Sequence, residues 1–189
     1  MITLGIDEVG RGSWAGPLVV GAVVLGHPIK GLTDSKLLSR PTRGKLSLII
    51  NLEAADVSLG WVSAQEIDQF GLTKATRLAI DRALTNIKAG FDEIIVDGKF
   101  NYLSDDQRAR AIVKADKTIP AVSAASIVAK VARDNWMIRV AAKEFPDYCF
   151  EKHVGYGTRL HRQALAEHGA CSIHRLTYKP LVSISSPSV

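Results

Sequence analysis

The sequence has only two cysteines and no long apolar run, and both shortages bear on the class of protein. Its two cysteines, Cys149 and Cys171, match no metal-ligand or redox spacing, which favours two free thiols over a disulfide. We therefore expect a reducing compartment, the cytoplasm. No apolar stretch reaches the ~18 residues that a membrane span needs. Met1 leads directly into a strand pattern, so we expect no signal peptide.

Positive charge is concentrated in the second half of the chain. The whole sequence has a net charge of +5, with 24 Lys and Arg against 19 Asp and Glu. Residues 1–106 hold 11 basic against 13 acidic side chains, whereas residues 107–189 hold 13 against 6. A basic half beside an acidic half suits a protein that binds a polyanion and keeps carboxylates for chemistry.

Apolar periodicity predicts strands first, followed by alternating strands and helices. Strands are predicted at 2–8, 18–25, 57–62 and 93–98, with a further extended segment at 111–116. Helices are predicted from a capping box that begins at Ser63, and at 73–87, 123–145 and 158–167. This order predicts an α/β fold with a mixed sheet, antiparallel in its N-terminal part and parallel through the helical crossovers.

The length of 189 residues predicts one domain. We expect that domain to span residues 1–180, with a small helical C-terminal part at about 146–180. The remaining segment, 181–189, is rich in serine and has no charged side chain, so we expect a flexible tail.

Four carboxylates follow or end predicted strands. Asp7 and Glu8 end the first strand and can share one centre only if that strand twists or ends there. Asp97 ends a later strand, and Asp116 ends the extended segment at 111–116. Ligand sites of open α/β sheets gather at the carboxyl ends of strands, so these side chains are candidates for one site. Clustered carboxylates repel one another, and Mg²⁺ or Mn²⁺ relieves that repulsion. Two such ions can position the attacking water and the leaving oxygen of a phosphodiester.

A second interpretation stays open for each carboxylate, because an Asp at a strand end is commonly a turn or capping residue. We interpret four other acidic residues in that way, as turn or surface side chains: Asp34, Asp105, Asp106 and Asp134. The Gly10-Arg11-Gly12 segment also has two interpretations. It is either a structural turn or a loop whose backbone N–H groups approach a phosphate or a sugar hydroxyl.

Motifs along nearly the whole chain resemble those of bacterial ribonuclease HII. They are GIDEVGRGSWAGPLVVGAVVL at the start, TDSKLLS at 33–39, IIVDG at 94–98, KAD at 114–116, SAASIVAKVARD at 123–134, HVGYGT at 153–158 and IHR at 173–175. They occur in the family's order over about residues 4–180. Ser13-Trp14 and Leu37 depart from the family pattern and concern only the shape and charge of the substrate groove.

The resemblance implies an RNase H-like fold with a small helical C-terminal extension. It implies a metal-dependent endonuclease that cuts the RNA strand of RNA–DNA hybrids and incises duplex DNA on the 5′ side of a single ribonucleotide. By motif position, the family's metal-binding carboxylates correspond to Asp7, Glu8, Asp97 and Asp116, with Mn²⁺ or Mg²⁺ as cofactor. Its ribonucleotide-sensing loop corresponds to Gly10, Arg11 and Gly12, and its junction tyrosine to Tyr156.

Three basic residues are further candidates for phosphate contacts: Lys36, Lys130 and Arg175. We expect a monomer that binds no membrane. Two other functions remain open. A non-catalytic binder of hybrid duplexes would show salt-sensitive binding without metal-dependent cleavage. A general phosphodiesterase acting on plain DNA would give the Gly-Arg-Gly loop and Tyr156 no function.

Overall fold

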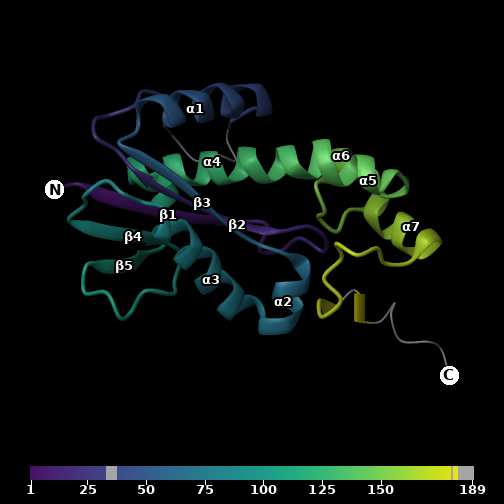
Figure 1. The fold of residues 1–189 in the computed structure, drawn as a ribbon. Helices are drawn as coiled ribbons and strands as arrows, with labels where there is room; N and C mark the ends of the chain where they lie inside the picture. The colour runs from purple at the N-terminus through teal and green to yellow at the C-terminus, as the bar shows by residue number, and fades with distance from the viewer. Residues whose placement is uncertain (33–37, 180, 183–189) are drawn as a thin grey trace.

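A mixed sheet forms the centre of the molecule in the computed structural model, which describes residues 1–32, 38–179 and 181–182 (Figure 1). Its strands are β1 (Thr3–Val9), β2 (Leu18–Val24), β3 (Asp56–Val62), β4 (Glu93–Asp97) and β5 (Ala109–Ile112). The order across the sheet is β3-β2-β1-β4-β5. The first three strands form an antiparallel meander, and β1, β4 and β5 run parallel. The predicted mixed sheet is therefore confirmed.

Strand β1 is the central strand and includes the two acidic residues, as the sequence pattern predicts. It continues through Asp7 and Glu8 to Val9, and Asp7 is paired with Gly21 of β2. The strand therefore ends one residue beyond the two acidic residues and not at them. Because adjacent strand residues point to opposite faces, the continuous strand separates the side chains of Asp7 and Glu8.

Helix α4 (Pro120–Trp136) covers one face of the sheet against β1 and β2. Its buried side is rich in alanine, which allows a close approach between helix and sheet. A Cβ on Gly21 would lie 2.3 Å from the carbonyl oxygen of Ala125, so only glycine fits at that position. The helix begins three residues before the predicted start at Ser123, because Pro120 occupies its first turn, where proline needs no hydrogen-bond partner.

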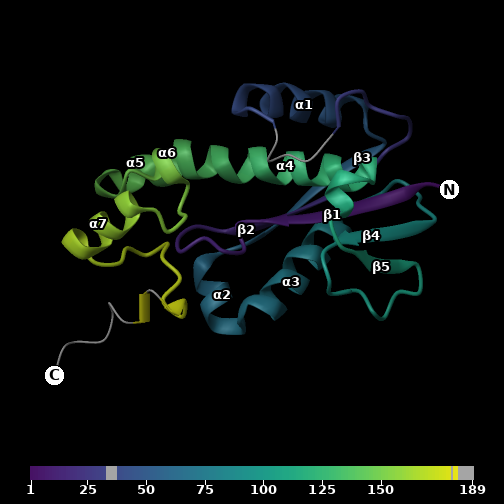
Figure 2. The same cartoon turned by 180° about the vertical axis from the view of Figure 1, so that it is seen from behind.

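Helices α2 (Ala64–Phe70) and α3 (Leu72–Thr85) lie on the opposite face of the sheet (Figure 2). The predicted capping box is confirmed: Ser63 accepts from the N–H of Glu66, and the Glu66 carboxylate accepts from the N–H of Ser63. The predicted alanine stripe of α3 is buried at Ala75, Ala79 and Ala83. This face holds the largest apolar core of the described residues, which includes Leu4 and Ile94 from the two parallel central strands.

Helix α1 (Arg40–Glu53) was not predicted from the sequence. It packs on the outer side of α4, where Leu46 and Ile50 are buried with Ile127 (Figure 1). Its start does have a sequence signal, since Ser39 caps the helix and Pro41 occupies the first turn. The signal is easily missed because Gly44 and the exposed Leu48 and Leu52 interrupt the amphipathic pattern.

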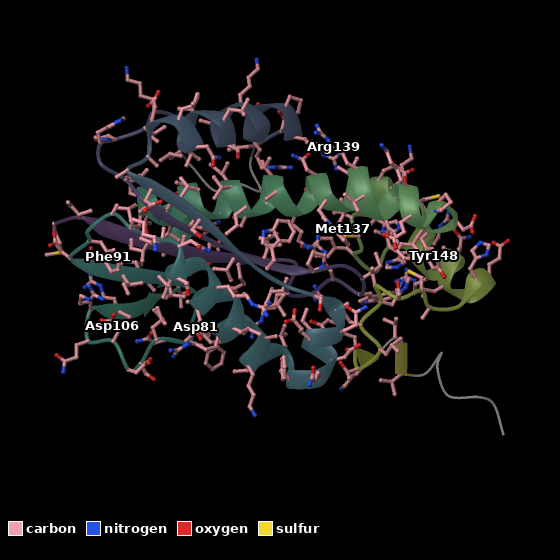
Figure 3. The ribbon with its side chains drawn as sticks, viewed as in Figure 1. Asp81, Phe91, Asp106, Met137, Arg139 and Tyr148 are labelled. Carbon is pink, nitrogen blue, oxygen red and sulfur yellow. The ribbon has the colours of Figure 1, made fainter. Side chains whose placement is uncertain are left out.

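The C-terminal part is a small helical layer, as expected. After α4, the chain forms a π-helical turn (Met137–Ala141), α5 (Ala142–Glu144), a 3₁₀ turn (Pro146–Tyr148), α6 (Phe150–His153) and α7 (Arg159–His168). Met137 and Tyr148 belong to the apolar core of this layer (Figure 3). Leu181 was expected to begin the flexible tail but is fully buried in the same core. Residues 183–189 lie outside the described residues.

Two further expectations concern cysteines and membranes. Cys149 and Cys171 are both free thiols, which confirms the prediction from their spacing. Within the described ranges, no helix is both long enough and apolar enough to span a membrane.

Candidate active site

Three of the four predicted carboxylates meet beside the central strand. Asp7 lies on β1, Asp97 is the last residue of β4, and Asp116 lies in a 3₁₀ turn (Ala115–Lys117) that follows β5. Each offers a carboxylate oxygen, and these oxygens lie within 4.8 Å of one another. A set of hard oxygen donors at this spacing suits Mg²⁺ or Mn²⁺. The donor set therefore fits a divalent cation.

Backbone contacts hold Asp97 and Asp116 in this arrangement. The N–H of Ala115 donates to Asp97 Oδ1 at 2.7 Å, which joins the ends of β4 and the 3₁₀ turn. The Ser123 hydroxyl donates to the backbone carbonyl of Asp116 at 2.5 Å. Asp116 was predicted to end an extended segment. Instead, Lys114 adopts a left-handed conformation with φ of 61°, and this reverses the chain before Asp116.

The surroundings of Asp7 oppose its ionisation. Burial raises the pKa of Asp7 well above its ordinary value, and the negative charges of Glu8 and Asp97 raise it further. Hydrogen bonds from Ser126 and from the N–H of Glu8 act in the opposite direction. Ser126, like Ser123, belongs to the Ser-Ala-Ala-Ser motif, for which the sequence alone indicated no individual role. The site without a cation is therefore electrostatically strained at neutral pH.

The raised pKa of Asp7 predicts a stability effect. The folded state binds a proton more tightly than the unfolded state, so stability falls as pH rises from the unfolded pKa of 3.8 through the higher folded value. At neutral pH, Asp7→Asn removes this penalty, and we expect the melting temperature of the cation-free protein to rise. Each kcal/mol of relieved repulsion corresponds to about 2–4 °C for a chain of this size.

The same variant is expected to lose stabilisation by Mg²⁺ or Mn²⁺. A bound cation raises the melting temperature of the wild type because it binds only the folded state. Scanning calorimetry of both proteins, with chelator and with each metal, measures the two effects. An Asp7→Asn protein that melts below the wild type in chelator, or that gains as much from metal, contradicts this electrostatic account.

Glu8 lies beside this group but outside the three carboxylates with closely spaced oxygens. Its Oε1 accepts from Arg11 Nη1 at 3.4 Å, and the same Arg11 nitrogen donates to the hydroxyl of Tyr102. Burial raises the pKa of Glu8, Arg11 lowers it, and Asp97 raises it again. The guanidinium of Arg11 therefore lies against the Glu8 carboxylate. The hydroxyl of Tyr102, a residue that sequence reasoning missed, accepts from it and holds it there.

The Gly10-Arg11-Gly12 loop is tightly packed at its first glycine and exposed at its last. Gly10 has φ of +87°, and a Cβ there would lie 2.2 Å from Nε of the buried Arg133. Gly12 is exposed, and a Cβ built there would meet no atom within 4 Å. The loop is thus fixed at Gly10 by packing, while its backbone at Gly12 is accessible to a ligand.

Two buried arginines form hydrogen bonds to the segment that follows this loop, residues 15–17. Arg133 donates to the backbone carbonyls of Ala15, Pro17 and Val154, and Arg175 donates to those of Gly16 and Arg11. Both arginines are 0% exposed. This position is at odds with the expected phosphate contact of Arg175, because its donors are directed to backbone carbonyls and to the hydroxyl of Tyr178. Arg175 instead supports the loop.

Tyr156 is half-buried and lies next to this arginine layer. The guanidinium carbon of Arg133 and Nζ of Lys130 each lie 5.5 Å from the centre of its ring. Lys130 also pairs with Asp134 at 3.0 Å.

Asp134 is 5% exposed and lies within α4, so its assignment as a turn or surface residue was wrong. Asp105 and Asp106 do lie in a turn, whereas Asp34 and Lys36 lie outside the described residues.

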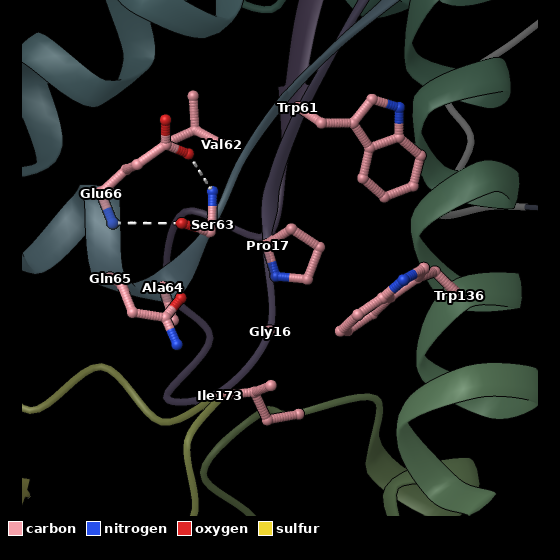
Figure 4. Close-up of a pocket in the computed structure, with 10 residues that line it drawn as sticks. All are labelled: Gly16, Pro17, Trp61, Val62, Ser63, Ala64, Gln65, Glu66, Trp136 and Ile173. Carbon is pink, nitrogen blue, oxygen red and sulfur yellow. Dashed lines mark hydrogen bonds between the residues drawn. The ribbon is translucent and has the colours of Figure 1, made fainter. Parts of the chain in front are cut away.

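A separate cavity of about 330 Å³ lies between β3 and α4 (Figure 4). Trp61, Trp136 and Pro17 line it, and none of the three clustered carboxylates does. Its one carboxylate, Glu66, accepts from Ser63 and from Arg82. This cavity therefore does not belong to the carboxylate site.

Comparison with known proteins agrees with the geometry of the site. The family model described as Ribonuclease HII matches residues 4–181. The ribonuclease HII of Nitrosococcus oceani is 46% identical over 179 residues, which cover 94% of this chain and 88% of that protein. The ribonuclease HII of Streptomyces griseus is 43% identical over 178 residues, covering 92% of this chain and 75% of that protein.

The fold is likewise similar to a solved structure. The crystal structure of the ribonuclease H2 from Pyrococcus horikoshii OT3 matches with a TM-score of 0.78 at 27% identity, over 97% of both chains. The expected RNase H-like fold is therefore confirmed. The chain belongs to the ribonuclease HII family and is a ribonuclease H, an endonuclease that cleaves RNA in RNA–DNA hybrids and requires a divalent metal ion.

Proposed function

We propose that this ribonuclease H also incises duplex DNA on the 5′ side of a single embedded ribonucleotide. One observation carries this proposal. The buried Arg133 packs against Gly10 in the loop that exposes the backbone of Gly12, and its guanidinium carbon lies 5.5 Å from the centre of the Tyr156 ring. Only the 2′-hydroxyl distinguishes RNA from DNA at one nucleotide, so a sensor needs backbone groups close to the sugar. The exposed glycine meets this requirement.

Asp7, Asp97 and Asp116 are the proposed ligands of the divalent ions, with Glu8 contributing from the edge of the site. The spacing of their oxygens and the raised pKa of Asp7 support this assignment. Both Mg²⁺ and Mn²⁺ suit these donors. When bound by these carboxylates, two ions would neutralise charge on the phosphodiester and lower the pKa of the attacking water, and cleavage would leave 5′-phosphate and 3′-hydroxyl ends.

The other residues position the substrate in this proposal. Gly10 and Gly12 bring backbone N–H groups to the ribose, and Arg11, held by Glu8 and Tyr102, lies at the phosphate chain. Tyr156 packs on the deoxyribose that follows the ribonucleotide and disfavours a second hydroxyl there. Lys130, beside Tyr156, and Lys36 are proposed phosphate contacts.

The proposed setting is a monomer in the cytoplasm that acts on RNA–DNA hybrids and on ribonucleotide-containing duplex DNA. The two free thiols support a reducing compartment. The basic second half of the chain supports a polyanionic substrate.

The test is cleavage of three labelled duplexes that share one sequence: DNA with a single ribonucleotide, all-DNA, and an RNA–DNA hybrid. We expect incision 5′ of the ribonucleotide with Mg²⁺ or Mn²⁺, none with chelator, and no cut in all-DNA. Tyr156→Phe keeps the ring and serves as the matched control for Tyr156→Ala, which is expected to lose junction cleavage.

Other outcomes separate the alternatives. Cleavage of the hybrid alone removes the single-ribonucleotide activity from the proposal. Cleavage of all-DNA indicates a general phosphodiesterase. Salt-sensitive binding without cleavage of any duplex indicates a non-catalytic binder.

A further inference from the structure

A connected set of histidines lies in the core of the C-terminal layer, outside the carboxylate site. His153, His161 and His174 are 6%, 0% and 2% exposed. The rings of His153 and His161 stack with centres 4.5 Å apart, and Nε2 of His161 lies 2.9 Å from Nε2 of His174. No step proposed above uses these side chains, so their arrangement needs its own explanation.

The hydrogen-bond partners at the two ends fix the protonation of the His161–His174 pair. Nδ1 of His161 lies 3.0 Å from the backbone carbonyl of Tyr156, which can only accept, so this nitrogen carries the proton. Neutral His161 therefore accepts at Nε2, and Nε2 of His174 donates to it. Nδ1 of His174 then accepts from the N–H of Cys171 at 2.9 Å. This series of hydrogen bonds runs from the N–H of Cys171 through His174 and His161 and ends at the carbonyl of Tyr156.

Burial keeps both histidines of this series neutral. It lowers the pKa of His161 and of His174 to about 4 each, so each ring carries only one proton at neutral pH. A second proton on His161 would sit at Nε2 and face the N–H of His174, and a second proton on His174 would sit at Nδ1 and face the N–H of Cys171. The donor direction is therefore fixed under working conditions.

The loop that carries Tyr156 needs such a constraint. Val154 is β-branched yet has φ of +44°, and Gly155 follows with φ of +85°. The carbonyl of Tyr156 accepts from the N–H of Thr158 as well as from His161. The ring of Trp14 packs against Gly157 and lies 5.7 Å from the ring of His161. His161 thus contacts the loop from inside the core.

We propose that His161 is a positioning residue for Tyr156: it holds the loop by its bond to the Tyr156 carbonyl, and His174 fixes the tautomer that makes this bond. The inference rests on the proposed function of Tyr156 at the ribose–deoxyribose junction. It assigns the specificity of that contact to two buried residues that do not touch the carboxylate site.

The test compares cleavage at a single ribonucleotide with cleavage of a long hybrid. His161→Leu removes the donor, and we expect junction cleavage to fall between about 10- and 100-fold more than hybrid cleavage. His161→Asn places an amide N–H near the position of Nδ1 and is expected to recover most of the ratio. A purely structural role would lower both activities together, and that result would overturn the proposal.

A double-mutant cycle with Tyr156→Ala separates this inference from the function on which it rests. If His161 acts through Tyr156, adding His161→Leu to Tyr156→Ala changes the cleavage ratio no further. Fully additive losses count against His161 as a positioning residue. If Tyr156→Ala alone leaves the ratio unchanged, the proposed role of Tyr156 fails first.

A measurement on the wild type covers the case in which His161→Leu does not fold. Long-range ¹H–¹⁵N correlation spectra report which ring nitrogen of a histidine carries the proton. We expect the Nδ1–H tautomer for His161 and the Nε2–H tautomer for His174 at neutral pH. The reverse tautomers would remove the bond to Tyr156 and with it the proposal.

Discussion

Asp97→Asn is expected to lower cleavage of an RNA–DNA hybrid by about 10³-fold or more in the presence of Mg²⁺ or Mn²⁺. The change removes one negative charge from the three carboxylates with oxygens within 4.8 Å of one another. It does so with little structural cost, because an asparagine oxygen can still accept from the N–H of Ala115. The loss should therefore reflect chemistry and metal binding.

Two measurements make this result specific. Hybrid binding in chelator should change little, since the basic surfaces are untouched, and a filter or fluorescence assay measures it. Asp105→Asn is the matched control, because Asp105 is an exposed turn residue paired with Arg77. That variant should cleave at nearly the wild-type rate. An Asp97→Asn enzyme with similar activity would mean that the metal-binding group lies elsewhere.

Arg133→Met is expected to lower the free energy of unfolding by about 3–5 kcal/mol. The guanidinium of Arg133 is fully buried and donates to the carbonyls of Ala15, Pro17 and Val154. Methionine fills a similar volume but leaves three buried carbonyls without their donor. Burial lowers the pKa of Arg133 to about 10, so the native side chain remains charged at neutral pH.

Urea unfolding of the wild type, Arg133→Met and Arg133→Lys measures this effect. Lysine keeps the charge but lacks the planar fork that serves three acceptors, so an intermediate loss is expected. Arg139→Met is the control, since Arg139 is exposed in the adjacent π-helical turn (Figure 3) and should change stability by less than ~0.5 kcal/mol. A loss below ~1 kcal/mol for Arg133→Met would show that water or neighbouring groups replace the guanidinium.

The sequence predicted the sheet well because strand periodicity and the capping box are local signals. The alternation at 2–6 and the β-branched run at 18–25 became β1 and β2, and Ser63 caps α2 as expected. The carboxylate cluster was predictable for a related reason, since the ends of neighbouring strands meet at one edge. The sequence left open whether β1 twists or ends at Asp7 and Glu8. The strand continues to Val9, and Glu8 lies outside the group of three.

The buried charges could not be predicted from local pattern. Arg133 and Asp134 lie in the last turn of a helix, and only tertiary packing determines that both are buried. Arg175 was interpreted as a candidate phosphate contact, with a solvated surface charge as the alternative, and it is neither exposed nor free of backbone partners. Its backbone acceptors lie 159 and 164 residues away in the sequence, beyond the reach of any periodicity. The resemblance to a family located the motif but did not indicate this role.

The same long separation has a consequence for synthesis on the ribosome. Arg11 and Gly16 emerge early, whereas Arg175, which binds their carbonyls, emerges 159 to 164 residues later. All three clustered carboxylates leave the exit tunnel before that arginine. A nascent chain thus contains the three carboxylates and Arg133, which binds the carbonyls of Ala15 and Pro17, well before Arg175 is made, and the hydrogen bonds of Arg175 form only near the end of translation.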